Sequence, residues 1–234
     1  MSRPRPISLL LMMLTFTTGL VDAVSILGLG HVFTALMTGN VVFVGLAAAG
    51  AANMSAGNSL LALASFALGA FVGGRIAAAR QSGSLRGWLL PVAIIEAALV
   101  VAAARAAELG GQNAPGSHAH GTTLYAIIAL CAVAMGLRSA TAVKIKDPDL
   151  KTTVLTLTLT GIAADAPMVG GDMQRWLRRV ASVLSLGSGA LLGGFLLLHY
   201  GLATPLLISA VLVLSATVAF AAHPRGRAPS GAER

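Results

Sequence analysis

The chain has 234 residues, of which 56% are hydrophobic and only 10% are charged, and its mean hydropathy is +0.83. Soluble domains average about 45–50% apolar and about 25% charged residues, so this composition excludes an ordinary soluble domain and indicates a polytopic membrane protein. The formal net charge of +8 does not indicate nucleic-acid binding, because the arginines stand at the ends of apolar runs, where they orient helices and contact anionic head groups.

The apolar runs predict an all-α transmembrane bundle of about eight spans, since a spanning helix needs about 20 apolar residues. The first run could also be a signal peptide, but it continues into a motif that recurs later, so we interpret it as a membrane helix. The sixth run alternates Thr with Leu or Val like a strand, yet an open strand would leave its backbone unpaired in lipid, which favours a helix. The expected spans cover residues 7–27, 32–50, 60–79, 88–107, 122–143, 153–170, 180–200 and 203–222.

The two halves of the chain resemble each other. The stretch from Gly19 to Asn40 is matched about 117 residues later by the stretch from Gly136 to Ile162. Four spans per half is an even number, so the two repeats should be parallel and related by an axis along the membrane normal. Three glycines of the third span recur in the seventh at an offset of 120, namely Gly69, Gly73 and Gly74, then Gly189, Gly193 and Gly194. The predicted organisation is a first repeat at 1–107, a linker at 108–121, a second repeat at 122–222 and a disordered tail at 223–234.

The basic residues provide a test of sidedness. With both termini in the cytoplasm, the eight-span topology places nine basic residues inside and six outside, which favours cytoplasmic termini. The loop that carries Arg80 and Arg86 would then lie outside, against the rule that basic loops stay in the cytoplasm. A re-entrant second segment would remove this conflict and leave six or seven spans, so this alternative stays open.

Three motifs resemble the YoaK family of multi-pass bacterial membrane proteins, a family defined by a domain of unknown function. They are GLVDA at Gly19–Ala23, MTGN at Met37–Asn40 and KTT at Lys151–Thr153. The second half departs from the family pattern, which typically reads Gly-x-Gln-Asn-Ala where this chain has GLRSA at Gly136–Ala140. The resemblance covers nearly the whole chain from the first to the seventh span. It implies a multi-pass protein of the bacterial cytoplasmic membrane, and it implies no chemistry.

Three ionisable residues are predicted to lie deep in the bilayer. Asp22 stands in the first span, where an ionised side chain costs ~2.5–3.5 kcal/mol, so it should face protein or a water-filled cavity. Arg138 is one position from the repeat equivalent of Asp22, and we hypothesise that the two pair or share a polar cavity. The alternative is that Arg138 extends to the interface while Asp22 bonds to neighbouring hydroxyls. Glu96 lies near the centre of the fourth span without an evident basic partner, and a carboxyl there could carry protons or bind a cation.

Further polar residues are candidates for binding a solute. Thr38 and Asn40 could line the path of a substrate or ion in a discontinuous helix, or form interhelical hydrogen bonds worth about 0.6 kcal/mol on average. The second copy of the motif adds four candidates, namely Ser139, Thr152, Thr153 and Thr156. Nothing predicts a metal site or a cofactor. The single Cys131 excludes an intrachain disulfide, and in its apolar run it is expected to be a buried packing residue.

A parallel duplication with intramembrane polar residues in matching positions favours a small secondary transporter or permease that works without ATP. Its expected partners are the lipid bilayer and a small polar or anionic solute, without nucleic acid. The alternative is a non-transporting sensory or assembly protein whose polar residues only join helices. No set of residues with catalytic spacing stands out, so an enzyme is not expected.

Overall fold

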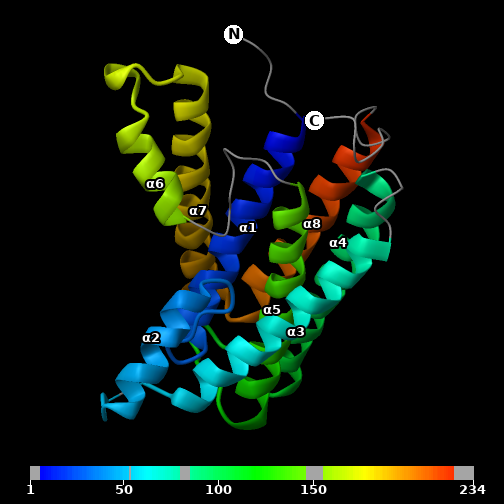
Figure 1. Cartoon of the computed structure of the whole chain (residues 1–234). Coiled ribbons are helices and arrows are strands. Elements are labelled where there is room, and N and C mark those ends of the chain that lie inside the picture. The colour runs from blue at the N-terminus through cyan, green and yellow to red at the C-terminus, as the bar shows by residue number, and fades with distance from the viewer. Residues whose placement is uncertain (1–5, 53, 80–84, 146–154, 224–234) are drawn as a thin grey trace.

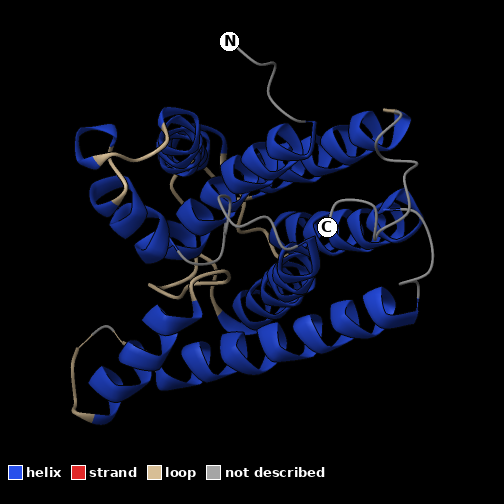
Figure 2. Cartoon of the chain, turned by 45° about the horizontal axis from the view of Figure 1, so that its top comes forward, coloured by secondary structure: helices blue, strands red, loops and turns tan. Residues whose placement is uncertain are grey.

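The computed structural model describes residues 6–52, 54–79, 85–145 and 155–223, and all the secondary structure in these ranges is helical (Figure 2). A short 3-10 helix, η1 (Pro167–Val169), joins the sixth helix to the seventh. Apart from His223, the tail predicted to be disordered lies outside the described residues. The helices labelled in Figure 1 are α1 (Pro6–Gly28), α2 (Met37–Ala48), α3 (Ala56–Ala79), α4 (Leu85–Leu109), α5 (Gly121–Ile145), α6 (Leu155–Ala164), α7 (Met173–Tyr200) and α8 (Ala203–Ala222).

Six of these helices are long and apolar enough to cross a membrane: α1, α3, α4, α5, α7 and α8. By contrast, α2 has 12 residues and α6 has 10, which gives lengths of about 18 Å and about 15 Å, well short of a hydrocarbon core of about 30 Å. The protein is therefore a polytopic helical membrane bundle. Among the described residues, the structure has the six spans of the alternative topology and not the eight of the first expectation.

The long helices alternate in direction. Ile7, Ala77, Trp88 and Phe220 pack in one apolar cluster, so α1 and α4 begin, and α3 and α8 end, at one end of the bundle, here called the first end. The opposite end is the second end. There the Ala119 amide, just before α5, donates to the carbonyl of Gly28 at the end of α1 (2.8 Å), and the Gly116 amide donates to Leu197 near the end of α7 (3.0 Å). Hence α1, α4 and α7 run toward the second end, while α3, α5 and α8 return.

The helices that open the two halves, α1 and α5, consequently run in opposite directions (Figure 1). The parallel arrangement expected for the two halves is therefore wrong. That expectation came from counting α2 and α6 as spans, which gave four crossings per half. Each half has three spanning helices in the described residues, and an odd number of crossings reverses the direction of whatever follows.

Glycines bring α1 and α7 into close contact. A methyl group on Gly19 would collide with the carbonyl of Leu186, and one on Gly189 would collide with the carbonyl of Phe16. Small residues that let two backbones touch are the usual packing device between membrane helices. The two helices run side by side in the same direction, although one belongs to each half of the chain.

The same kind of contact joins α3 to α5. A methyl group on Gly136 would collide with the carbonyl of Phe66, and one on Gly69 would collide with the carbonyl of Val133. In the sequence, Gly136 is the match of Gly19, and Gly69 is the match of Gly189. Each close contact therefore takes one helix from each half, so the halves interlock instead of packing as separate domains.

The segment between α1 and α3 turns back into the bundle. The hydroxyls of Ser25 and Thr34 lie 2.8 Å apart in a hydrogen bond, and the backbone amide of Ala35 faces Asp22. The chain that follows Gly28 thus retraces the last turns of α1 before α2 leads out again. Residues 29–48 form a re-entrant segment, as the alternative topology required.

At the first end, α6 folds back on the start of α7. The indole Nε1 of Trp176 donates to the carbonyl of Ile162 (3.0 Å), and Arg179 pairs with Asp165 (2.7 Å). The side chain of Asp172 caps α7 by accepting a hydrogen bond from the Arg175 amide (2.9 Å). The short α6 therefore stays attached to the helix that follows it.

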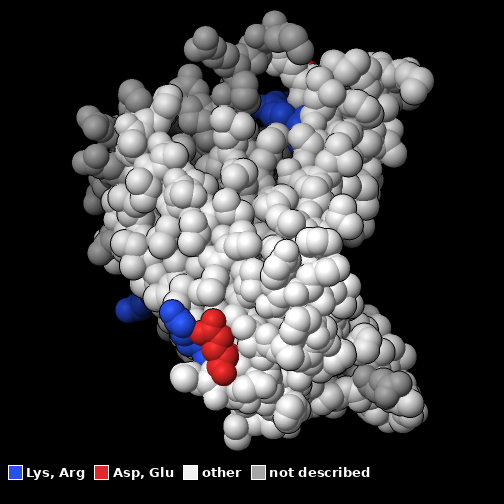
Figure 3. Space-filling model, turned by 180° about the vertical axis from the view of Figure 1, so that it is seen from behind, with Lys and Arg blue, Asp and Glu red and all other residues white. Residues whose placement is uncertain are grey.

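The described basic side chains gather at the first end. Arg75 stands near the end of α3, Lys144 near the end of α5, and three arginines occupy the first turns of α7, whereas Arg105 near the end of α4 is at the second end. Figure 3 shows a face between the two ends that is almost free of charged side chains. The eight-span topology would place Arg75 and Lys144 at the end opposite the start of α1 and Arg105 at the same end, and the structure reverses all three because α2 does not cross. Because α3 ends and α4 begins at the first end, the helix ends that flank the basic 80–86 loop lie on the same side as the start of α1.

Candidate functional site

Arg138 joins three helices in the interior of the bundle. From α5, its Nε donates to Oε1 of Glu96 on α4 (2.7 Å), and its Nη2 donates to the same oxygen. Its Nη1 donates to the carbonyl of Leu14 and to the hydroxyl of Thr18, both on α1 and both at 2.9 Å. An ion pair and two further hydrogen bonds thus hold α1, α4 and α5 together at one point.

This point lies deep in the bundle. Arg138 and Glu96 are only 5% and 3% exposed, and Glu96, Leu14 and Thr18 stand near the middle of their helices. Arg138 therefore does not extend to the interface. The expectation that Glu96 has no evident basic partner is wrong: its partner is Arg138, which comes from the other half of the chain.

Asp22 lies beside this ion pair but outside its hydrogen bonds. Its side chain is 8% exposed, Arg138 acts on it electrostatically, and the backbone amide of Ala35 is its hydrogen-bond donor. Its Oδ1 is buried and has no hydrogen-bond partner among the described residues. The structure forms no ion pair between the described side chains of Asp22 and Arg138, so the hypothesis of direct pairing fails, while that of a shared polar environment is consistent with these positions.

Asn40 fixes the re-entrant segment from the first turn of α2. Its Oδ1 accepts from the amide of Phe33 (2.9 Å), and its Nδ2 donates to the carbonyl of the same residue (2.6 Å). The ring of Phe33 covers Gly39, where a Cβ would collide with it, and stacks on Phe43 at 5.7 Å between ring centroids. These contacts place the start of α2 at the depth of Asp22, since Ala35 precedes α2 by only two residues.

The chain matches the family described as "Protein of unknown function (DUF1275)" over residues 10–219. The chain belongs to the DUF1275 family. A 54-residue stretch is 52% identical to the "UPF0700 transmembrane protein YoaK" of Bacillus subtilis (strain 168), and it covers 23% of this chain and 24% of that relative. The resemblance to a YoaK-like membrane family is therefore confirmed. No solved structure matches the chain.

The remaining candidate residues of this DUF1275 protein lie apart from the charged cluster. Ser139 follows Arg138 on α5 and is half-buried, whereas Thr38 on α2 and Thr156 on α6 are exposed. Thr152 and Thr153 lie outside the described residues. The structure thus brings together Asp22, Glu96 and Arg138, while the hydrogen bonds of Asn40 stay within the re-entrant segment.

Two residues at or beside the cluster, Thr18 and Thr34, were not predicted from the sequence. Thr18 accepts from Arg138, and Thr34 bonds to Ser25 beside Asp22. A usable signal was present for Thr18, which stands four residues before Asp22 and therefore on the same face of a helix. No local signal marks Thr34, because only the turn back of the re-entrant segment places it there.

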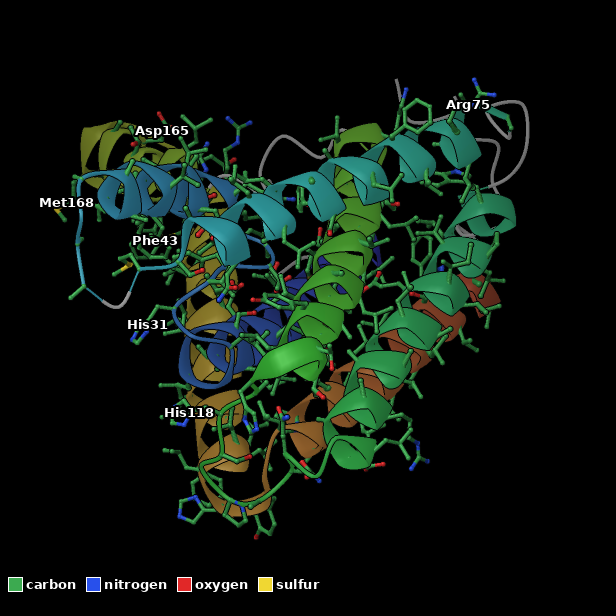
Figure 4. The ribbon with its side chains drawn as sticks, turned by 90° about the horizontal axis from the view of Figure 1, so that it is seen from below. His31, Phe43, Arg75, His118, Asp165 and Met168 are labelled. Atoms are coloured by element: carbon green, nitrogen blue, oxygen red, sulfur yellow. The ribbon has the colours of Figure 1, made fainter. Side chains whose placement is uncertain are left out.

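The histidines and the cysteine lie elsewhere. His31 and His118 are exposed and stand at the edge of the molecule in Figure 4, away from the helix interior. No group of three or more His, Cys, Asp or Glu side chains that could hold a metal occurs among the described residues. Cys131 is fully buried, as its apolar surroundings predict.

Proposed function

We propose that this DUF1275-family protein is a secondary transporter or permease of the bacterial cytoplasmic membrane, which moves a small polar or anionic solute without ATP. The observation that carries the proposal is the cluster of Arg138, Glu96 and Asp22 in the middle of a membrane bundle. A buried ion pair is weak evidence for stability, because apolar residues of similar volume often serve as well. Ionisable groups at this depth are instead typical of substrate and ion pathways.

The arrangement of the helices supports the same proposal. The helices α1 and α5 run in opposite directions, and each makes the same kind of glycine contact, α1 with α7 and α5 with α3. We therefore propose that residues 1–107 and 122–222 are an inverted internal repeat. In transporters with inverted repeats, the binding site lies near the midplane between the repeats, and rocking of one part against the other opens it to either side. The short α2, which begins deep beside Asp22, corresponds to the discontinuous helices that line such sites.

We further propose that the first end faces the cytoplasm. Five of the described basic residues lie at that end and Arg105 at the other, and basic residues near helix ends are retained on the cytoplasmic side. Both chain termini would then be cytoplasmic, because α1 begins and α8 ends at the first end.

A second candidate is a non-transporting sensory or assembly protein. Asn40 uses its amide oxygen and nitrogen on Phe33, and Arg138 donates to Glu96, Leu14 and Thr18. These internal bonds favour a packing role for both residues. Such bonds do not account for Asp22, whose Oδ1 has no partner among the described residues, so a transporter remains the preferred function. We propose no catalytic role for any residue.

The test is solute flux into liposomes that contain the purified full-length protein. A panel of small polar and anionic solutes is offered to the wild type, to Asp22→Asn and to Ser215→Ala, whose hydroxyl is exposed on α8. We expect at least one solute to enter with the wild type and Ser215→Ala, and entry to fall at least tenfold with Asp22→Asn. A wild type that moves no solute, or an Asp22→Asn variant that matches it, would contradict the proposal.

A further inference from the structure

We propose that Asp22 is a reversible proton-binding site, with the proton held at its Oδ1 atom. The inference deepens the transporter function and, in naming the proton as the coupling ion, rests on it. It begins from the position of the carboxyl group, which is more than nine-tenths buried. One of its oxygens has a donor, the Ala35 amide, while Oδ1 has no partner among the described residues. A buried carboxylate oxygen without a donor is costly chiefly through its charge, and a bound proton removes that charge.

The net charge of the cluster also favours a proton on Asp22. Arg138 carries one positive charge, and Glu96 and Asp22 would carry two negative charges if both were ionised. The guanidinium gives two hydrogen bonds to Glu96 and none to Asp22, so Glu96 is the carboxylate that the arginine compensates. The excess negative charge falls on Asp22, and one proton makes the whole cluster neutral in a medium where a net charge is expensive.

A proton suits this site better than a metal ion. Metal cations such as Ca²⁺ require six to eight oxygen ligands, whereas a proton requires a single acceptor. The hydroxyls beside Asp22 are already engaged: Thr18 bonds to Leu14 and Arg138, and Ser25 bonds to Val21 and Thr34. Among the described buried side-chain atoms beside Arg138, Oδ1 of Asp22 is the one without a hydrogen-bond partner, and a proton needs a single acceptor.

The surrounding elements present few other ionisable groups to Asp22. Arg138 faces it from α5, and Glu96 on α4 faces Arg138. Neither α2 nor α8 contains an ionisable residue, and α7 packs on this part of α1 through Gly193. The re-entrant segment carries only His31, which is exposed, and Arg75 of α3 stands at the first end. Protonation of Asp22 is thus governed by its burial, by Arg138 and by the Ala35 amide.

Proton release has a structural consequence. When the proton leaves Oδ1 for water, the electron pair stays on the carboxylate, and Asp22 then competes with Glu96 for the guanidinium of Arg138. One arrangement ties α5 to α4, and the other ties α5 more strongly to α1. The proton therefore biases which helix Arg138 holds, and this is the coupling between a bound ion and helix position that a secondary transporter needs.

Infrared difference spectroscopy of the full-length protein in lipid nanodiscs tests the inference. Spectra are recorded as the pH is raised and lowered within the range where the protein stays folded. We expect a carbonyl band of a buried protonated carboxyl that titrates in the wild type and is lost in Asp22→Asn. The band should persist in Asp165→Asn, a matched change at an exposed carboxyl.

A band that is absent from the wild type, or that remains in Asp22→Asn, would overturn the inference. If Asp22→Asn does not fold, ¹³C labelling of aspartate carboxyls in the wild type decides the assignment, because the band then shifts for Asp22 and stays in place for Glu96. The measurement uses no solute. A missing band therefore removes the proton site and leaves the transport function to the flux assay, whereas absent flux with an intact band contradicts transport alone.

Discussion

Arg138 and Glu96 stand 42 positions apart in the sequence, yet two N–H groups of the guanidinium donate to a single oxygen, Oε1, of the carboxylate. Both side chains are almost completely buried. Since Arg138 also donates to the carbonyl of Leu14 and to Thr18, this relationship links the second half of the chain to two helices of the first. It is the polar centre of a bundle whose other interhelical contacts are mainly apolar.

The first prediction concerns the energy of this pair. Arg138→Met should lower the free energy of unfolding by about 3–5 kcal/mol, because it leaves Glu96 buried without its partner. The double variant Arg138→Met with Glu96→Leu should regain most of that loss, because no unpaired charge remains. Thermal stability of the purified variants, followed by size-exclusion chromatography after heating, measures both effects. Ser215→Ala is the control, and a double variant no more stable than Arg138→Met would contradict the prediction.

The second prediction concerns the two close helix contacts. Gly189→Ala and Gly69→Ala should each destabilise the fold by about 1–3 kcal/mol, since the added methyl would collide with the carbonyl of Phe16 or Val133. Gly187→Ala and Gly74→Ala on the same helices should be neutral or slightly stabilising, because a methyl there meets open space. Yield and melting temperature in detergent distinguish the pairs. Equal behaviour of Gly74→Ala and Gly69→Ala would mean that α3 and α5 do not touch as described.

The third prediction concerns sidedness. A cysteine at His118 should react with a membrane-impermeant maleimide in intact cells, since the exposed side chain lies at the second end. A cysteine at Gln174, in the first turn of α7, should react only after the membrane is permeabilised. The native Cys131 is buried and gives the background. Labelling of both positions in intact cells would exclude a cytoplasmic first end.

The fourth prediction concerns the start of α7. Hydrogen bonds from the Arg175 and Gln174 amides hold the pKa of the exposed Asp172 carboxyl below its usual range. Its stabilising effect is therefore complete above the ordinary pKa of about 3.9 and is lost as the pH falls through the lower pKa of the folded protein. At neutral pH, Asp172→Ala should speed hydrogen exchange of these amides, and Asp172→Asn should do so less because Asn also caps helices. A difference between Asp172→Ala and the wild type that persists at strongly acidic pH would contradict this assignment.

Much of the fold followed from local composition. Runs of about 20 apolar residues indicate membrane helices because lipid excludes unpaired backbone groups, and each of the six long helices contains a predicted span. The glycine matches at an offset of 120 also had a structural meaning, since Gly69 and Gly189 both lie at close helix contacts. The number of crossings was not determined in this way. The segments of α2 and α6 are apolar enough to span, and only their helix lengths show that they do not.

For the candidate site, too, the sequence determined one part and the tertiary structure the other. The sequence by itself identified Asp22, Glu96 and Arg138, because an ionisable residue in an apolar run is conspicuous wherever it lies. Which of them pair was decided by the tertiary structure alone. Direction and register between helices depend on contacts such as those of Gly19 and Gly136, and one reversed span exchanges the neighbours of every side chain on it. For that reason Arg138 hydrogen-bonds to Glu96 while Asp22, its expected partner, keeps an unpaired oxygen beside it.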